Sequence, residues 1–395
     1  VTGNVHVGQN IEPTGDIDFN ADINADGEVL VDGGHDITLA ATEDIIAVGD
    51  VNIDAGATAL VDGDINGHDI TLRGEHALLI NGELNATGET NLSGGTIDAT
   101  SAITSATDVT VRSDEEVTLA EVEALGGFVD IYGGGHVTLN GDIEATTDIT
   151  VFSLDSGITQ LGSLGTAGAG GADNVTLTAL KDPNPDLDPD SQIASNGTIV
   201  SRGNINANNT ITLEARSDVT LSASLLADTG AINVLSDNAD VTGEAGSKLE
   251  ATAGTVNVTA GSDVSLAETV DAGTSFNLNA VDTITLGGVI TTGGAVNVGQ
   301  ATRTVGALAI NGAVDATGAI DIDADGTVAI ADVTVDGDAA ITIDTLQSIV
   351  LTGTLGGDSI AVRSENGKLD VNGLVTADGS TVLLSAGDNV SVTDT

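Results

Sequence analysis

One proline-rich segment carries oxygen-bearing side chains at every second position and could bind a hard cation. These are Asp182, Asn184, Asp186, Asp188 and Asp190. Calcium takes about six to eight oxygen ligands, and calcium-binding loops commonly begin with ligands at alternate positions. Leu187 and Ile193 stand where such a loop has a glycine and a bidentate glutamate. The segment therefore predicts either a calcium site or a solvated acidic loop, and calcium is an optional ligand, with no cofactor required.

A second set of polar side chains recurs at one position of a repeated phrase. The set comprises Asn233, Asn257, Asn277, Asn297 and Asp321. Asn side chains that stack on successive strands can hydrogen-bond to one another. We therefore expect a structural ladder at these residues. A flat polar column of this kind could also bind carbohydrate or pack against a neighbouring molecule.

Aspartate also recurs immediately before the strand-like segments. The positions are Asp36, Asp69, Asp108, Asp148, Asp218 and Asp263. Aspartate commonly accepts hydrogen bonds from backbone amides of its own turn, so we expect these residues to cap turns. If the segments stack, like charges approach one another, and salt or divalent cations should then stabilise the protein.

The residues do not form a catalytic constellation. His35, His68 and His136 each fall in a glycine-rich turn before a strand-like segment, where a polar turn residue is the simpler explanation. Enzymes that cleave acidic polysaccharides need basic residues for the substrate, or clustered acids in a groove. The chain has only nine Lys and Arg residues. We expect that it is not an enzyme, and a polysaccharide-degrading activity is the least favoured alternative.

The elements that must position these residues follow from an aliphatic phrase that returns about every 20 residues. In VNVTA, Val256 and Val258 alternate with polar residues, which is the pattern of a strand with one buried face. A second strand is expected at Val264 and a weaker third at Val270. A fixed return indicates one structural unit stacked many times. The sequence predicts an all-β fold, a single-stranded parallel β-helix (β-solenoid) with about 20 residues and three strands per coil.

The periodicity predicts one continuous β-solenoid over residues 1–395, with an irregular region at 154–198. Pro183, Pro185 and Pro189 cannot donate to a strand ladder, so residues 181–190 should leave the stack as a projecting acidic loop. The strand pattern reaches both ends of the sequence without a polar cap. We therefore expect either further flanking sequence or end-to-end stacking of copies.

The charge balance limits the partners of the chain. It has 60 acidic residues and a formal net charge of −51, which excludes electrostatic binding to nucleic acid or to an anionic membrane. No apolar run approaches the length of a membrane span, so we expect no membrane insertion. Cations are the expected small partners. With no cysteine and only five Phe and Tyr residues, the core must consist of Val, Ile, Leu and Ala.

The ITL, VNV and VTL phrases, separated by Gly-Asp and Ala-Gly turns, resemble the repeat shafts of filamentous-haemagglutinin-like bacterial adhesins and exoproteins. The resemblance covers nearly all of the chain outside residues 154–198. It implies a secreted, extracellular or cell-surface shaft that serves adhesion. We expect a structural protein that forms a rigid acidic rod, as an adhesin shaft or as a filament subunit that associates end to end and laterally. A carbohydrate-binding adhesin, with or without a dependence on calcium, is the alternative, with glycans as partners.

Overall fold

The structure is a computed structural model that describes residues 1–8, 15–165, 172–180, 197–299, 306–335 and 339–393. Within these ranges the regular elements are all β-strands, without a helix. The chain divides into two compact units, unit 1 (Val1–Ala207) and unit 2 (Asn208–Thr395). Each unit is a parallel β-solenoid, and together they contain about 17 turns of about 20 residues. The predicted fold class is confirmed.

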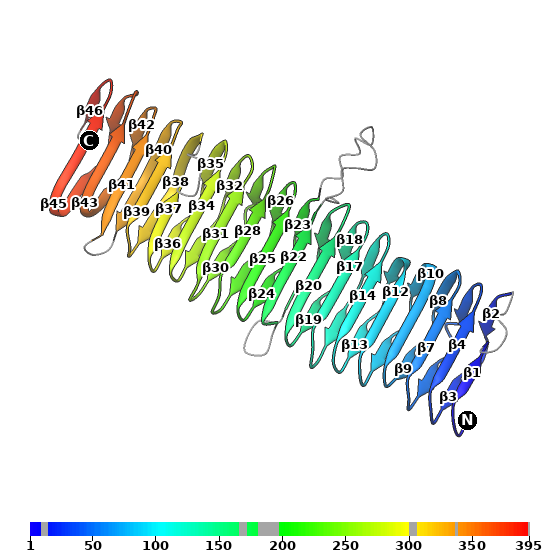
Figure 1. The fold of residues 1–395 in the computed structure, drawn as a ribbon. Helices are drawn as coiled ribbons and strands as arrows, with labels where there is room; N and C mark the ends of the chain where they lie inside the picture. The colour runs from blue at the N-terminus through cyan, green and yellow to red at the C-terminus, as the bar shows by residue number, and fades with distance from the viewer. Residues whose placement is uncertain (9–14, 166–171, 181–196, 300–305, 336–338, 394–395) are drawn as a thin grey trace, which may run out of the picture. The chain divides into compact units, whose positions relative to one another are not determined.

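Each coil of unit 1 contributes strands to three faces, which we number in chain order (Figure 1). The first face contains β1 (Val5–Val7), β4 (Val29–Gly33), β7 (Val51–Ala55), β10 (Ile70–Ile80), β12 (Thr90–Ala99), β14 (Val109–Ser113), β17 (Val129–Gly133), β20 (Asp148–Ser153) and β22 (Asn174–Ala179). The second face contains β2 (Ile17–Phe19), β5 (Ile37–Leu39), β8 (Thr58–Val61), the ends of β10 and β12, β15 (Val117–Leu119), β18 (Val137–Leu139), β21 (Ile158–Gln160) and β23 (Ile199–Ser201). The third face contains β3 (Ile23–Ala25), β6 (Ile45–Ala47), β9 (Ile65–Gly67), β11 (Leu84–Ala86), β13 (Ile103–Ser105), β16 (Val122–Ala124), β19 (Ile143–Ala145) and β24 (Ile205–Ala207).

Unit 2 repeats the same three faces. The first face contains β25 (Thr210–Ala215), β28 (Ile232–Ser236), β31 (Thr255–Ala260), β34 (Ser275–Ala280), β37 (Ala295–Val298), β39 (Ile320–Ala324), β41 (Ala340–Thr345), β43 (Leu355–Ser364) and β45 (Val375–Ala386). The second face contains β26 (Val219–Leu221), β29 (Val241–Gly243), β32 (Val264–Leu266), β35 (Thr283–Leu286), β38 (Ala307–Ala316), β40 (Val328–Val335), β42 (Ile349–Leu351), β44 (Leu369–Val371) and β46 (Val390–Val392). The third face contains β27 (Leu225–Ala227), β30 (Leu249–Ala251), β33 (Val270–Ala272), β36 (Ile290–Thr292) and parts of β38, β40, β43 and β45.

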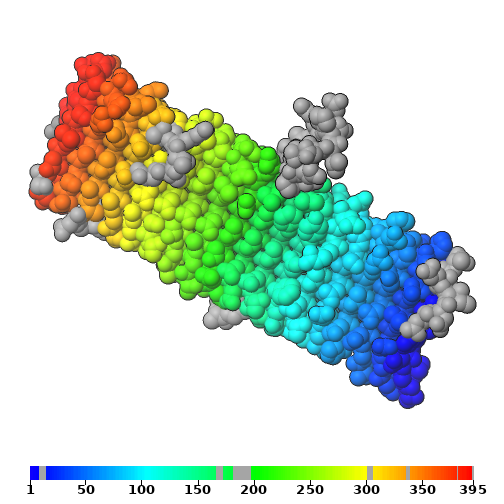
Figure 2. Space-filling model, in the orientation of Figure 1, coloured from blue at the N-terminus to red at the C-terminus, as the bar shows by residue number. Residues whose placement is uncertain are grey.

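The coils stack because equivalent strands pair in parallel and in register from one coil to the next. Val109 of β14, for example, pairs with Val129 of β17, and Val111 pairs with Ile131. All four side chains point inward and are fully buried. Within each unit, the space-filling view shows successive coils as adjacent bands in chain order (Figure 2). The alternation of aliphatic and polar residues therefore places one aliphatic column inside and one polar column outside each face.

The region expected to be irregular contains two regular strands. β21 and β22 lie between residues 154 and 198 and pair in register with neighbouring coils. Ile158 of β21 pairs with Ile199 of β23, so this coil has a longer connection than the others. The predicted projecting loop, residues 181–190, lies outside the described residues. Continuity of one solenoid across both units stays a prediction.

Two features concern the surface of the stack. In the part of the chain that the structure describes, no helix has the length and apolar character that a membrane span requires. The coil that contains β46 leaves Val390 and Val392 exposed.

Candidate functional site

The Asn residues predicted to form a ladder are brought together on the first face of unit 2. The Nδ2 group of Asn257 donates to Oδ1 of Asn233 at 2.8 Å, and Asn277 donates to Asn257 at 2.7 Å. Asn297 donates in turn to Asn277 at 2.8 Å. Asp321 follows in register with Asn297 on the next coil. Each inner amide thus donates to the preceding coil and accepts from the following one.

The predicted calcium-binding side chains cannot be placed in the same way. Asp182, Asn184, Asp186, Asp188 and Asp190 all lie outside the described residues. Their arrangement stays a prediction.

The aspartates that precede strands form a second kind of ladder. Asp263 shows the pattern, because its Oδ1 atom accepts a hydrogen bond from the amide of Thr283, one coil further on, at 2.7 Å. The expectation that these carboxylates accept hydrogen bonds from amides of their own turn was wrong, because the donor amide belongs to the next coil. The same contact from a carboxylate to the next coil's amide is made by Asp22, Asp36, Asp44, Asp50, Asp64, Asp69, Asp108, Asp142, Asp148, Asp218, Asp240 and Asp332.

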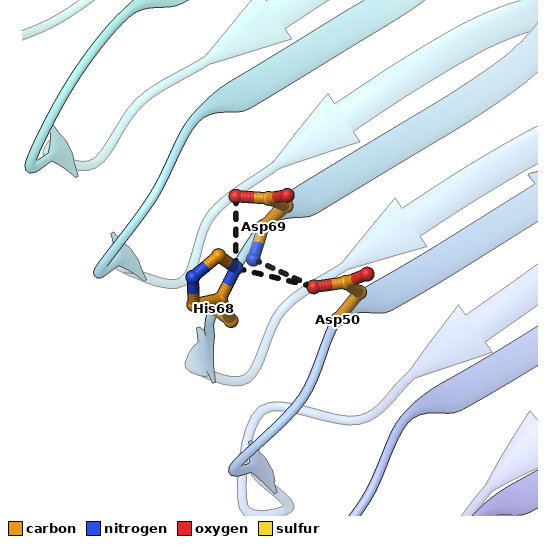
Figure 3. A group of neighbouring side chains, drawn as sticks. All are labelled: Asp50, His68 and Asp69. Atoms are coloured by element: carbon orange, nitrogen blue, oxygen red, sulfur yellow. Dashed lines mark hydrogen bonds and ion pairs between the residues drawn. The ribbon is translucent and has the colours of Figure 1, made fainter.

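One place in this ladder also contains a histidine (Figure 3). Nδ1 of His68 lies 3.3 Å from Oδ1 of Asp50 and 3.1 Å from Oδ1 of Asp69. Three such atoms within 4.8 Å of one another could hold a divalent cation. These separations are close to the distance between ligands around zinc, which binds imidazole nitrogen and carboxylate oxygen at about 2.0–2.2 Å.

The ladder itself explains the two carboxylates of this trio. Asp50 accepts from the amide of Asp69, and Asp69 accepts from the amide of Glu89, as aspartates do elsewhere without a histidine nearby. The side chains of His68 and Asp50 are about half exposed. We therefore regard His68 as a hydrogen-bonding addition to a structural column.

A different surface feature lies on the first face of unit 1. A depression of about 420 Å³ is bordered by two arginines and the single tyrosine of the chain. Its lining consists of Arg73, Glu75, Ser93, Gly94, Arg112, Ser113, Asp114 and Tyr132. Small-molecule sites commonly have volumes of about 300–1,000 Å³, so the depression has the size of a binding site.

The depression follows from the order of side chains in one outward column. Arg73 pairs in register with Ser93, Ser93 with Arg112, and Arg112 with Tyr132. Because strands in adjacent coils lie about 4.8 Å apart, the two arginines are about 10 Å apart along the stack. The short side chain of Ser93 between two long ones leaves the surface hollow.

The arginines are held by ion pairs that draw them away from each other. Nη1 of Arg73 lies 3.0 Å from Oδ1 of Asp54 on the preceding coil. Nη2 of Arg112 lies 2.7 Å from Oδ2 of Asp130 on the following coil. Both arginine side chains remain about half exposed beside the depression.

An aromatic pair continues the column past the second arginine. The rings of Tyr132 and Phe152 stack with centroids 5.3 Å apart and an interplanar angle of 7°. Phe152 is on the following coil, so it covers the face of Tyr132 that points away from the depression. The other face of Tyr132 is directed toward the coils that carry Arg112 and Ser93.

This depression was not predicted from the sequence. A signal was present, since Arg73 and Arg112 are two repeats apart in a chain with nine basic residues, and Tyr132 and Phe152 are one repeat apart. That spacing places all four residues in one column only when the register of every intervening coil is known. β10, for example, has a register shift relative to β12 between Gly74 and Ala77.

Two side chains of unit 1, His136 and Glu144, have pKa values that burial and neighbouring charges shift. Burial lowers the pKa of His136, although the nearby Glu116 acts in the opposite direction. Burial also raises the pKa of Glu144, and the adjacent acids Glu123, Asp142 and Glu121 raise it further. Neither group lines the depression.

Comparison of the chain with known protein families, with curated proteins and with solved structures gave no match.

Proposed function

We propose that the chain is a structural extracellular protein whose stacked coils form a rigid acidic rod, as the shaft of an adhesin or as a filament subunit. The observation that supports this most is that two sets of outward side chains, the Asn ladder and the aspartate ladder, form hydrogen bonds between successive coils. Asn257 bonds to the coils on both sides of it, and Asp263 bonds to the coil after it. These bonds resist separation of coils, which is the property that a shaft requires.

Electron microscopy of the purified full chain tests this proposal. We expect straight particles of uniform width whose length corresponds to about 17 turns stacked in one line. Filaments that grow with protein concentration would favour the filament subunit over the shaft. Particles with a flexible bend between unit 1 and unit 2 would contradict the rigid rod. Antibody labelling of intact producing cells tests the surface location. Labelling that appears only after the cells are permeabilised would contradict it.

A carbohydrate-binding adhesin is the second candidate function. The depression in unit 1 favours it, because Arg73, Arg112 and Tyr132 combine fixed polar donors with an aromatic ring. A glycan array probed with the full chain, with and without calcium, tests this function. Absence of binding in both conditions would contradict it.

The calcium dependence of such binding is a separate proposal about residues 182–190. Oxygen ligands at alternate positions suit calcium. Isothermal titration of the full chain with calcium should detect binding that is lost in a variant with both Asp182→Ala and Asp186→Ala. Equal calcium binding by the variant would contradict a site at this segment.

A further inference from the structure

We infer that the depression between Arg73 and Arg112 binds a short neutral oligosaccharide. This inference rests on the second proposed function, carbohydrate binding, and names its site and ligand class. The site is built from one outward column of unit 1 and comprises Arg73, Ser93, Arg112 and Tyr132 with the adjacent carboxylates.

The first argument concerns rarity. The whole chain contains nine Lys and Arg residues and five Phe and Tyr residues. Four of these fourteen residues, Arg73, Arg112, Tyr132 and Phe152, lie in one column within five successive coils. The solenoid does not require these residue types, because the same column in other coils carries residues as different as Thr178, Glu214 and Leu235. The concentration of these uncommon residues in neighbouring coils makes this stretch of the column a candidate recognition surface.

The second argument concerns preorganisation. Arg73 and Arg112 each form an ion pair, with Asp54 and Asp130, which limits the positions of their guanidinium groups before a ligand arrives. A guanidinium has five N–H donors in a fixed fork, and each ion pair engages only one of the terminal nitrogens. The remaining donors can bond to ligand oxygens with little further loss of side-chain freedom.

The third argument selects a neutral ligand over an acidic one. The carboxylates Asp54 and Asp130 balance the two arginines, and Glu75 and Asp114 on the rim add two further negative charges. An anionic sugar would meet net repulsion there, in a chain whose formal charge is already −51. A second copy of this chain would meet the same repulsion. Sugar hydroxyls suit the mixture, because each hydroxyl can accept from a guanidinium and donate to a carboxylate.

The fourth argument concerns the aromatic ring. Tyr132 lines the depression, with Phe152 stacked on one side of its ring and Arg112 next to it in the column on the other. The part of the ring that borders the depression offers an apolar contact to the C–H groups of a pyranose ring. We place one sugar ring beside Tyr132 and the next over Ser93 and Gly94, with Arg73 at the far end. The distance of about 10 Å between the arginines suits a short oligosaccharide better than a single sugar.

The test uses the full chain with neutral and uronate-containing oligosaccharides from an array, followed by titration calorimetry of the strongest neutral ligand. Arg73→Ala and Tyr132→Ala should each weaken binding at least about tenfold, as expected for central contacts. Ser93→Leu should abolish binding by filling the depression. Tyr132→Phe should retain most of the affinity, because the ring remains.

The matched control is Arg363→Ala in unit 2. Arg363 holds the equivalent outward position of a first-face strand and pairs with Asp344 on the preceding coil, as Arg73 pairs with Asp54. The Arg363→Ala substitution should leave the affinity for the oligosaccharide unchanged. Circular dichroism of each variant establishes whether it is folded. If Tyr132→Ala does not fold, Ser93→Leu and Tyr132→Phe still test the site.

Each outcome bears on a separate statement. Absence of binding to any oligosaccharide would overturn carbohydrate binding and this site together. Binding that is unaffected by Arg73→Ala and Ser93→Leu would overturn this site and leave carbohydrate binding elsewhere on the chain. Preference for a uronate-containing ligand would overturn the neutral ligand class.

Discussion

Two outward columns of the first face, the Asn column in unit 2 and the column of Arg73 in unit 1, are built differently. In unit 2, Asn233, Asn257 and Asn277 are identical neighbours, and each amide bonds to the next. In unit 1, Arg73 and Ser93 are unlike neighbours, and the arginine bonds to a carboxylate on its far side. Both columns rest on the same inward aliphatic pattern. The difference therefore arises from the outward residues alone.

This contrast separates two roles that a solenoid surface can have. Identical amides satisfy one another along the stack, which stabilises the coils and leaves few donors for a ligand. Unlike side chains differ in length, so they leave a hollow, and their unused donors face it. A uniform column is thus best interpreted as structural and a varied column as a recognition surface. The predictions below test that distinction, from the largest expected effect to the smallest.

The Asn ladder of unit 2 should be sensitive to the loss of one member. Asn257→Ala removes two side-chain hydrogen bonds, one to Oδ1 of Asn233 and one from Nδ2 of Asn277, so we expect the free energy of unfolding to fall by about 2 kcal/mol. Urea denaturation followed by circular dichroism measures this. Thr110→Ala, at the matching outward position of unit 1, should cost less than about 0.5 kcal/mol. Equal losses would remove the distinction between the columns.

The core of unit 1 contains one residue whose replacement should stabilise the protein. Thr90 is fully buried, and its hydroxyl has no hydrogen-bond partner among the described residues. Its neighbours in the inward column are Ile70 and Val109. Thr90→Val keeps the shape and removes an unsatisfied polar group, so we expect a gain of about 1 kcal/mol in urea denaturation.

The control for this change is Thr71→Val, on the outer side of the preceding coil. Its hydroxyl is not enclosed in the core, so stability should change little. A loss of stability in Thr90→Val would show that the buried hydroxyl stabilises the folded state, and would contradict this prediction.

The aspartate ladder is common to both units and should respond alike in both. Asp263→Ala removes the acceptor of the Thr283 amide, with an expected loss of about 1 kcal/mol. Asp263→Asn keeps an acceptor oxygen and should lose less. Asp108→Ala makes the same change in unit 1, where the amide of Phe128 is the donor. Hydrogen exchange at the amides of Thr283 and Phe128 reports each effect, and unchanged exchange would argue against the ladder.

The smallest effect concerns like charges in the outward column of unit 2 that corresponds to Arg73. Burial raises the pKa of Asp323, and the nearby Asp344, Asp321 and Asp325 raise it further. A carboxyl with a raised pKa in the folded state opposes folding at neutral pH, and this opposition fades as pH falls through that raised value toward the ordinary 3.8. Asp323→Asn should therefore raise the melting temperature slightly at pH 7.

The same variant and wild type should have nearly equal melting temperatures at about pH 2.5, well below the ordinary 3.8, where the carboxyl of Asp323 is almost fully protonated in both folded and unfolded states. Added salt should reduce the difference at pH 7, because part of it arises from repulsion between exposed charges. A difference that persists unchanged in acid would show that charge at Asp323 is not the cause.

Much of the fold could be predicted because the repeat is local information. The alternation at Val256 and Val258 predicts a first-face strand, and β31, β32 and β33 occupy the three predicted segments of that coil. The Asn positions were predicted for the same reason, since a residue that recurs once per coil must recur on one face. The partner of each aspartate could not be predicted, because the amide that Asp263 contacts is 20 residues away.

The sequence by itself determined the period, the inward columns and the acidic character of this protein, since each depends only on residue type and spacing. The tertiary structure decided which side chains become neighbours across coils. Arg73, Ser93, Arg112 and Tyr132 belong to four separate coils, and only the parallel register places them in one column. The hollow at Ser93 exists because a short side chain lies between two long ones in space, and no local pattern in the sequence contains that relation.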